Sequence, residues 1–294
     1  MLLRDYFLEK EIFQDETFNE LGYSHSIGNL VLTFCDNIHY LKIALNNSAI
    51  SAVIITEELL KDINVTNKGI CVVQNPRESF FDLYEYMVKK NLFSSSFKYG
   101  IGENVTVSES SIISPKSYIG DNTIIGENVV IKDDVYIGND CFIDVGVIIG
   151  NHGILYTTKD GNNSFIKHAG VVKIGNHVTL LANSVIVKSI FSNMPTVVDD
   201  YSIIGIATTI GHESKIGKNC RVLGNCVVAK NANIGNNTIV GSSSVIRENI
   251  TIGKKVDIKA GSIVVKDLKD NDVVSGNFAM NHTKMVKNFF KVQR

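Results

Sequence analysis

Aliphatic residues recur at every sixth position through most of this chain, and this period constrains the fold more than any other feature. Period six matches neither the turn of an α-helix nor the alternation of a half-buried strand. It is typical of a parallel β-helix, in which each repeat supplies a short strand and a tight corner. The repeat positions fall in three runs: Ile101, Val107, Ile113, Ile119, Ile125, Ile131, Ile137, Ile143 and Ile149; Ile174, Leu180 and Ile186; and Val198, Ile204, Ile210, Ile216, Val222, Val228, Ile234, Val240, Ile246, Ile252, Ile258 and Val264.

Three repeats close one triangular coil, and stacked coils bury the aliphatic side chains inside a prism. The Gly, Asn, Asp and Ser residues that follow many repeat positions suit the left-handed conformations of tight corners. We therefore predict a mainly β protein with a left-handed parallel β-helix over residues 99–268. The pattern fails within 151–172 and 187–197, which we expect to leave the prism as loops.

The remaining chain follows other patterns. Residues 1–98 hold three buried apolar runs that predict strands and three segments that predict helices, so we expect a small N-terminal α/β domain. Residues 269–294 form a tail with helical character. The predicted strands are 28–34, 49–56 and 69–75, and the predicted helices are 39–47, 56–63 and 78–91.

Composition excludes several classes of protein. The chain has 294 residues, a net charge of −1 and no block of Lys and Arg, which disfavours a nucleic-acid partner. It has no signal-peptide pattern and no apolar run long enough to span a bilayer, which favours the cytoplasm. Its five cysteines lack the C-x-x-C spacing of metal or redox sites, so we expect buried thiols.

Several segments resemble one enzyme family across nearly the whole chain. The stretch FCDNIHYLKIALNNSAISAVIIT, then CVVQNPRESF, and then the repeats resemble the UDP-3-O-acylglucosamine N-acyltransferases of the lipid A pathway. Within the repeats the likeness extends to IGNHGILY, to Asp199-Asp200 and to the segment from Ile210 to Glu213. The resemblance implies transfer of an acyl group from a thioester to the amine of a nucleotide-linked sugar, in a homotrimer with sites between neighbouring coils.

His212 is the candidate general base. A sugar ammonium must lose a proton before it attacks a thioester, and imidazole titrates in the required range. His212 follows the inward Ile210 by two positions, so it lies at a corner. The resemblance also implies a backbone amide one coil further on as the oxyanion donor, and that position is Lys230.

The chain departs from the family at four places. Lys230 stands where the family has a glycine as oxyanion donor, and the role can survive because every residue offers a backbone amide. The acidic residue seven positions before the family histidine is Gly205 here, and a second histidine aligns with Asn249. The loop that carries Asp-Arg-Gly in the lipid A enzymes reads KSIFSNMP. These changes favour a relative that acts on a different amino sugar.

Phe34, Asn37 and Tyr40 are the candidate nucleotide-binding residues. The resemblance implies that aromatic rings hold the base while an amide binds its edge. One amide cannot separate uracil from thymine, so UDP and dTDP sugars both stay open. Taken alone, the same three residues also suit ordinary core packing.

Asn151, His152 and His168 lie in the first loop and are candidates for substrate binding, because loop excursions often wall a cleft. Surface or structural roles are the alternative. We expect no metal site, because the repeats lack the close histidine pair of zinc-dependent relatives of this fold. No bound cofactor is expected either.

The acyl donor is expected to be acyl-CoA or acyl-ACP. Lys284, Lys287, Lys291 and Arg294 recur along one face of the predicted tail helix. Such a stripe suits the acidic surface of an acyl carrier protein or the phosphates of coenzyme A, although a solvated face is the alternative.

Three functions are therefore compared. The first is an N-acyltransferase for a dTDP- or UDP-linked amino sugar of a surface glycan. The second is the lipid A enzyme itself, with hydroxyacyl-ACP as donor. The third is a non-catalytic scaffold that binds nucleotide sugars.

Overall fold

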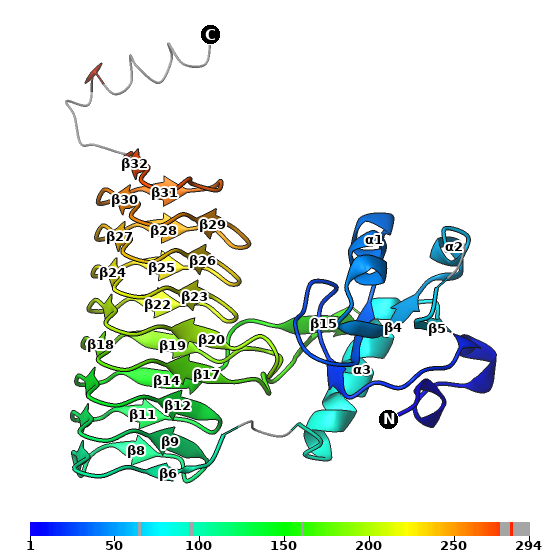
Figure 1. Ribbon diagram of the computed structural model, residues 1–294, viewed down its shortest axis with the longest axis horizontal. Helices are drawn as coiled ribbons and strands as arrows, with labels where there is room; N and C mark the ends of the chain where they lie inside the picture. Colours follow the sequence, from blue (N-terminus) through cyan, green and yellow to red (C-terminus); the bar gives the residue numbers. More distant parts are fainter. Residues whose placement is uncertain (64–65, 94–96, 160, 277–282, 285–294) are drawn as a thin grey trace.

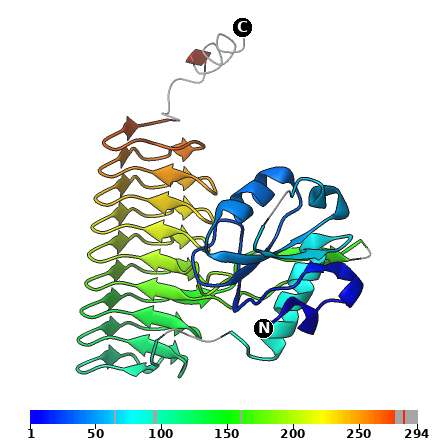
Figure 2. The ribbon, with the colours of Figure 1, turned by 45° about the vertical axis from the view of Figure 1, so that its right-hand side comes forward.

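A long triangular prism and a smaller α/β domain make up the molecule. The computed structural model describes residues 1–63, 66–93, 97–159, 161–276 and 283–284. Figures 1 and 2 show the α/β domain beside the middle coils of the prism.

Three parallel sheets form the faces of the prism, as the six-residue period predicts. The first sheet contains β7 (Thr106–Val107), β10 (Ile124–Ile125), β13 (Phe142–Ile143), β18 (Thr179–Leu180), β21 (Ile203–Ile204), β24 (Arg221–Val222), β27 (Ile239–Val240), β30 (Asp257–Ile258) and β32 (Val273–Val274). The second contains β8 (Ile112–Ile113), β11 (Val130–Ile131), β14 (Ile148–Asn151), β19 (Val185–Val187), β22 (Thr209–Ile210), β25 (Val227–Val228), β28 (Val245–Ile246) and β31 (Ile263–Val264). The third contains β6 (Gly100–Ile101), β9 (Ser117–Ile119), β12 (Val135–Ile137), β17 (Val172–Ile174), β20 (Thr196–Val198), β23 (Lys215–Ile216), β26 (Asn233–Ile234) and β29 (Thr251–Ile252). The prediction of a left-handed parallel β-helix is confirmed.

The register explains why the period is six. Ile124 pairs with Thr106 one coil below and with Phe142 one coil above, so equivalent residues stack. The repeat residues point inward and are almost all inaccessible, whereas Ile101 is 60% exposed and Val107 36% exposed because the first coil has no neighbour beneath it. Most corners hold a residue with positive φ, and Asn is the most frequent type there.

The N-terminal domain has a five-stranded sheet in the order β1-β5-β4-β3-β2. Its strands are β1 (Ile12–Gln14), β2 (Glu20–Leu21), β3 (Val31–Phe34), β4 (Ile50–Ile55) and β5 (Gly69–Val72), and β1 alone runs antiparallel to its neighbour. Its helices are η1 (Leu3–Asp5), η2 (Glu9–Glu11), α1 (Ile38–Asn46), α2 (Glu57–Leu60) and α3 (Pro76–Lys89). The three strands and three helices predicted after residue 27 are therefore confirmed, while β1, β2, η1 and η2 were missed because they are short and weakly patterned.

The two interruptions of the prism join it to the N-terminal domain. The first contains the hairpin of β15 (Tyr156–Lys159) and β16 (Asn162–Phe165). Leu155 and Ile166 beside the hairpin, and Ile190 and Phe191 in the second interruption, belong to the same apolar core as the inner face of α3. A division at residue 98 therefore separates residues that share one core.

The end of the chain also differs from the predicted boundaries. Pairing within the prism continues to β32, which lies beyond residue 268. Lys284 lies in the described part of the tail and is exposed, whereas Lys287, Lys291 and Arg294 lie outside the described residues. No helix in the described part of the chain is long and apolar enough to cross a membrane.

Candidate functional site

One edge of the prism carries the candidate site. The corners after β8, β11, β14, β19, β22, β25 and β28 stack along this edge, because the strands themselves are in register. Both interruptions leave the prism here, and the N-terminal domain packs against them. Two clefts result, one on each side of the interruptions.

The cleft on the side of the later coils, here called the upper cleft, has a volume of about 320 Å³. Its lining comes from the N-terminal domain, from the first interruption and from three successive corners. These residues are Tyr23, Ser24, His25, Phe34, Asp36, Tyr40, Arg77, Leu155, Glu213, Lys230, Asn231 and Asn249.

The lower cleft is larger, at about 630 Å³. It lies beneath the interruptions, between the lower corners and the segment that follows α3. Its lining residues are Val88, Asn91, Phe93, Tyr99, Lys116, Lys132, Asp133, Asp134, Gly150, Asn151, His152, His168, Ala169 and Lys188.

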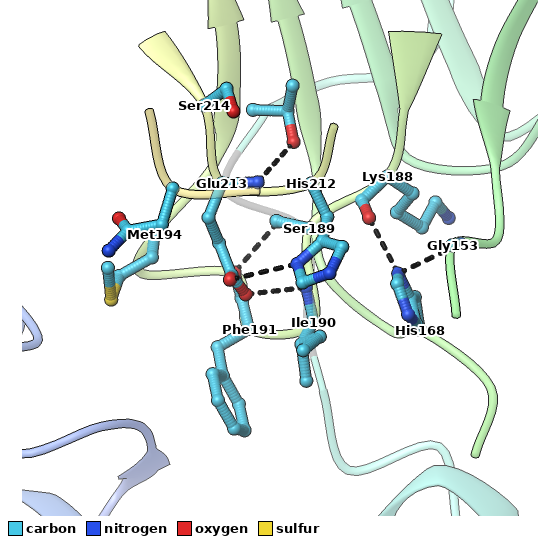
Figure 3. A network of polar contacts seen from close by, with 12 residues as sticks. Gly153, His168, Lys188, Ser189, Ile190, Phe191, Met194, His212, Glu213 and Ser214 are labelled. Carbon is cyan, nitrogen blue, oxygen red and sulfur yellow. Dashed lines mark hydrogen bonds and ion pairs between the residues drawn. The ribbon is translucent and has the colours of Figure 1, made fainter. Parts of the chain in front are cut away.

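His212 and Glu213 form a buried pair at the centre of the edge. The His212 Nδ1 atom lies 3.0 Å from the Glu213 Oε2 atom, and the two side chains are 8% and 2% exposed. The backbone N–H of Ile190 donates to the other carboxylate oxygen at 3.0 Å. A proton on Nδ1 is thus held by the carboxylate, which leaves Nε2 as the nitrogen that can accept a proton (Figure 3).

Local backbone geometry places this pair. Glu213 has φ of 62°, and its N–H donates to the Thr196 hydroxyl at 2.8 Å. Gly211 lies beneath the next corner, where a Cβ would come within 2.7 Å of the Lys230 backbone nitrogen. A side chain at position 211 would therefore force apart the two corners that carry His212 and Lys230.

Glu213 is the acidic partner that the sequence argument missed. We looked for that residue seven positions before His212, where Gly205 stands. The backbone of Gly205 instead packs against Leu223 and Gly224 of the next coil. The left-handed turn at Glu213 brings its side chain back toward His212. The available signal was the His-Glu pair that begins two positions after the repeat residue Ile210.

His168 lies beside His212, with 5.0 Å between the ring centroids. Its Nδ1 atom is 2.8 Å from the Lys188 carbonyl oxygen, so this nitrogen must carry the proton and donate it. The Gly153 N–H, at 3.4 Å from the same nitrogen, cannot then donate to it, and the shorter contact decides the tautomer. Burial lowers the pKa of His168 to about 4, against the opposing effect of the Lys188 carbonyl, so the ring is neutral near pH 7.

His152 completes a row of three imidazole rings. Its ring centroid lies 5.9 Å from that of His168, and its Nδ1 atom accepts the His168 backbone N–H at 3.2 Å. Burial, followed by the charge of Lys188, lowers the pKa of His152. Among the residues that the structure describes, no three side chains of His, Cys, Asp or Glu are arranged to hold a metal ion.

The predicted nucleotide-binding residues are only partly brought together. Phe34 and Tyr40 line the upper cleft. Asn37 does not line it, because its side-chain oxygen accepts the Tyr40 N–H at 3.1 Å as the N-cap of α1. Its amide nitrogen donates to Asp36 at 2.8 Å. In this structure the amide of Asn37 thus serves the helix start rather than the cleft.

Besides Glu213, two charged residues of the upper cleft escaped the sequence argument. Asp36 follows β3, and Arg77 lies in the first turn of α3 with its guanidinium 5.2 Å from the Phe81 ring centroid. Neither has a repeat or motif to mark it. Lys230, which was expected to contribute its backbone amide, lines the same cleft together with Asn249.

Asn151, His152 and His168 all line the lower cleft. The predicted site residues therefore divide between two clefts, and the buried His212–Glu213 pair links them. Glu213 belongs to the upper lining, while the His212 ring contacts His168 of the lower lining.

The five cysteines, Cys35, Cys71, Cys141, Cys220 and Cys226, are all buried free thiols, as predicted. Burial raises the pKa of each, so they remain protonated near pH 7. They contribute to packing and do not line either cleft.

Comparisons with known proteins agree with the fold. Residues 99–133 match the family model described as bacterial transferase hexapeptide (six repeats). No curated protein sequence matches the chain. A solved UDP-N-acetylglucosamine acyltransferase from Campylobacter jejuni shares 20% identity, with a TM-score of 0.53 over 65% of this chain and 78% of that one. A second, from Arabidopsis, shares 22% identity, with a TM-score of 0.49 over 65% and 73% of the two chains.

Proposed function

We propose that the protein is an N-acyltransferase that moves an acyl group from acyl-CoA or acyl-ACP to the amine of a UDP- or dTDP-linked amino sugar. The observation that carries the proposal is the buried His212–Glu213 pair between two clefts. The named activity of the Campylobacter jejuni neighbour, an acyltransferase for a UDP-linked sugar, is of the same chemical class.

The pair supplies the base that the reaction needs. The sugar ammonium first loses one proton to solvent. Glu213 holds the Nδ1 proton, so Nε2 of His212 accepts the second proton from the attacking amine nitrogen as the C–N bond forms at the thioester carbonyl. The tetrahedral intermediate then collapses, the C–S bond breaks, and imidazolium returns the proton to the thiolate. The products are the amide and the free thiol. The Lys230 backbone amide is the proposed donor to the oxyanion.

The upper cleft suits a nucleotide sugar. Phe34 and Tyr40 provide apolar ring surface for a pyrimidine, while the guanidinium of Arg77 and the ammonium of Lys230 suit a diphosphate. Because Glu213 lines this cleft and contacts His212, a nucleotide sugar bound there would have its sugar end near the proposed base. In this proposal the Asn37 side chain exchanges its N-cap bond with the Tyr40 N–H for a contact with the base edge when the nucleotide binds.

We further propose a homotrimer. One face of the prism presents a row of aliphatic side chains outward, and Ile112, Val227, Val245 and Ile263 in this row are 67%, 43%, 38% and 61% exposed. The row flanks the edge that carries His212, so a neighbouring subunit on this face would wall the site. Reduced, buried thiols agree with a cytoplasmic enzyme.

Replacing His212 by Ala tests the proposal. We expect turnover to fall by at least about a hundredfold because a general base is lost, and the melting temperature to fall as well because the buried Glu213 carboxylate loses its partner. Substrates would be a panel of UDP- and dTDP-linked amino sugars with short and long acyl donors, with products identified by mass spectrometry. Unchanged turnover would remove His212 as the general base, and absence of product from every substrate with the unaltered protein would leave the non-catalytic scaffold. Product from UDP-3-O-acylglucosamine with hydroxyacyl-ACP alone would instead establish the lipid A reaction.

A further inference from the structure

The lower cleft has no assigned ligand, although one of its lining residues, His168, contacts the ring of His212. Its innermost residue, His168, is 4% exposed and contacts the His212 ring from below. The upper cleft approaches Glu213 from the other side. A two-substrate reaction at His212 requires two approaches, and the prism edge provides them.

His168 presents a hydrogen-bond acceptor without a partner. Because Nδ1 donates to the Lys188 carbonyl, Nε2 of the neutral ring carries a lone pair. That atom is buried and receives no hydrogen bond from the residues that the structure describes. Buried acceptors are normally satisfied, so this one fits a ligand that brings an N–H or O–H group.

Position 153 keeps this acceptor close to the base. A Cβ on Gly153 would meet the rings of His168 and His212 and the Val187 side chain, each at 3.0 Å. Glycine there lets the two rings approach each other and leaves no side chain between them.

The floor of the lower cleft is fixed by a partly buried ion pair. The Lys188 ammonium, 7% exposed, lies 3.4 Å from Asp134, which also accepts the Tyr99 hydroxyl at 2.9 Å. The charge of Lys188 is therefore compensated within the protein. Its carbonyl is the group that orients His168, so the ion pair stabilises the acceptor as well.

The mouth of the lower cleft is cationic and partly apolar. Lys116 is 62% exposed and lies 4.0 Å from Asp133, and within the described residues the exposed Lys132 forms no ion pair. Val88 and Phe93, from the end of α3 and the segment after it, add apolar surface. A ligand that fits has an anionic end, an apolar body and a polar N–H group some distance further in.

We infer that the lower cleft binds the phosphopantetheine arm of the thioester donor, with its phosphate at Lys116 and Lys132 and an amide N–H directed to Nε2 of His168. This inference rests on the proposed function, because it assigns the second substrate of that reaction. It places the nucleotide sugar above His212 and the thioester below it. The tail lysines predicted from sequence are not needed for the arm.

Direct binding tests the site without relying on turnover. Coenzyme A, and separately pantetheine, which lacks the phosphate, are titrated calorimetrically into the full-length protein. Lys132→Glu should weaken coenzyme A binding by about tenfold and leave pantetheine binding unchanged, because it reverses a charge near the phosphate only. His168→Phe should weaken both ligands. Lys269→Glu, the same change on an exposed lysine at the far end of the prism, should weaken neither.

Nucleotide binding provides the second half of the test. UDP and dTDP should bind Lys132→Glu like the unaltered protein and bind Arg77→Ala more weakly. The inference is overturned if Lys132→Glu and His168→Phe both bind coenzyme A as tightly as the unaltered protein does. It is also overturned if these variants lose affinity for UDP instead of coenzyme A. Melting temperatures identify a misfolded His168→Phe protein, and Lys132→Glu alone then decides.

The two proposals can fail separately. If coenzyme A binding depends on Lys132 but no amino sugar is acylated, the lower site stands and the proposed reaction fails. If acylation occurs but Lys132→Glu leaves the KM of the acyl donor unchanged, the reaction stands and the lower site fails.

Discussion

Two stretches of the same prism behave differently. From Val198 to Val264 the coils are unbroken, and each repeat position does the same work as its neighbours above and below. Around residues 151–197 the chain leaves the prism twice, and there side chains are positioned by contacts that the repeat does not specify. The regular coils thus repeat one core, while the irregular ones position the residues of the candidate site.

The largest expected effect separates packing from chemistry. Phe191→Ala should cost about 3–5 kcal/mol of unfolding free energy and also lower kcat, because Phe191 anchors the second interruption against Tyr23, Phe80 and Tyr84. Ile216→Ala, in the unbroken stretch, should cost about 2–5 kcal/mol and leave kcat unchanged. Chemical denaturation and steady-state kinetics on both variants measure this. An equal loss of kcat in both would erase the distinction.

Acid should act mainly on the interrupted stretch. The unfolded chain takes up a proton on His168 near pH 6.5, whereas the folded protein takes it up at about 4. Between these values the unfolded state binds more protons, so the free energy of unfolding falls as the pH is lowered, by up to about 3 kcal/mol. The full contribution is present above pH 6.5. Unfolding curves from pH 7 to pH 4 measure the fall, and His168→Gln should flatten it; an equally steep fall in that variant would assign the effect to other groups.

The carboxylate of the proposed catalytic pair should matter less than the imidazole. Glu213→Gln keeps the shape of the side chain but removes its charge, so we expect kcat to fall by about tenfold because the hydrogen bond that orients the His212 ring becomes weaker. Steady-state kinetics on this variant and on His212→Ala measure the difference. An unchanged kcat in Glu213→Gln would show that Glu213 acts by packing alone.

The smallest effect compares two asparagine corners. Asn237 and Asn249 have φ of 62° and 59°, and each accepts a hydrogen bond from the Asn one coil below, at 2.8 and 3.0 Å. Alanine at either should cost about 1 kcal/mol of unfolding free energy. Only Asn249 lines the upper cleft, so only Asn249→Ala should also raise the KM of the nucleotide sugar severalfold. Equal KM values in the two variants would remove Asn249 from the site.

The same contrast explains what the sequence could predict. A six-residue period specifies which side chains point inward, so the prism and the corner position of His212 followed from Ile210 and its equivalents. Glu213, Arg77 and Lys188 belong to no period, and they reach the site through a left-handed turn, a helix start and a partly buried ion pair. Asn37 is the opposite case, a residue that the sequence assigned to base binding. In the structure its side chain instead caps the start of α1.

The second interruption offered a signal that we interpreted only as a break. The segment KSIFSNMP contains Ile190, Phe191 and Met194, all buried, whereas a loop in water rarely carries three such side chains. Large apolar residues in a break between repeats indicate that the break docks on something. The partner, the core of the N-terminal domain, could be identified only from the structure, because the contacts span more than a hundred residues of chain.

The shared core also sets an order of events on the ribosome. The first ninety residues are synthesised first, but their core stays open until Leu155, Ile166, Ile190 and Phe191 have been made. Meanwhile the lowest coils can already stack, since each needs only the coil before it. The last residues of the α/β core are thus synthesised after the first coils of the prism. A nascent chain arrested before residue 191 would expose an apolar surface that these residues normally cover, and chaperones would bind it.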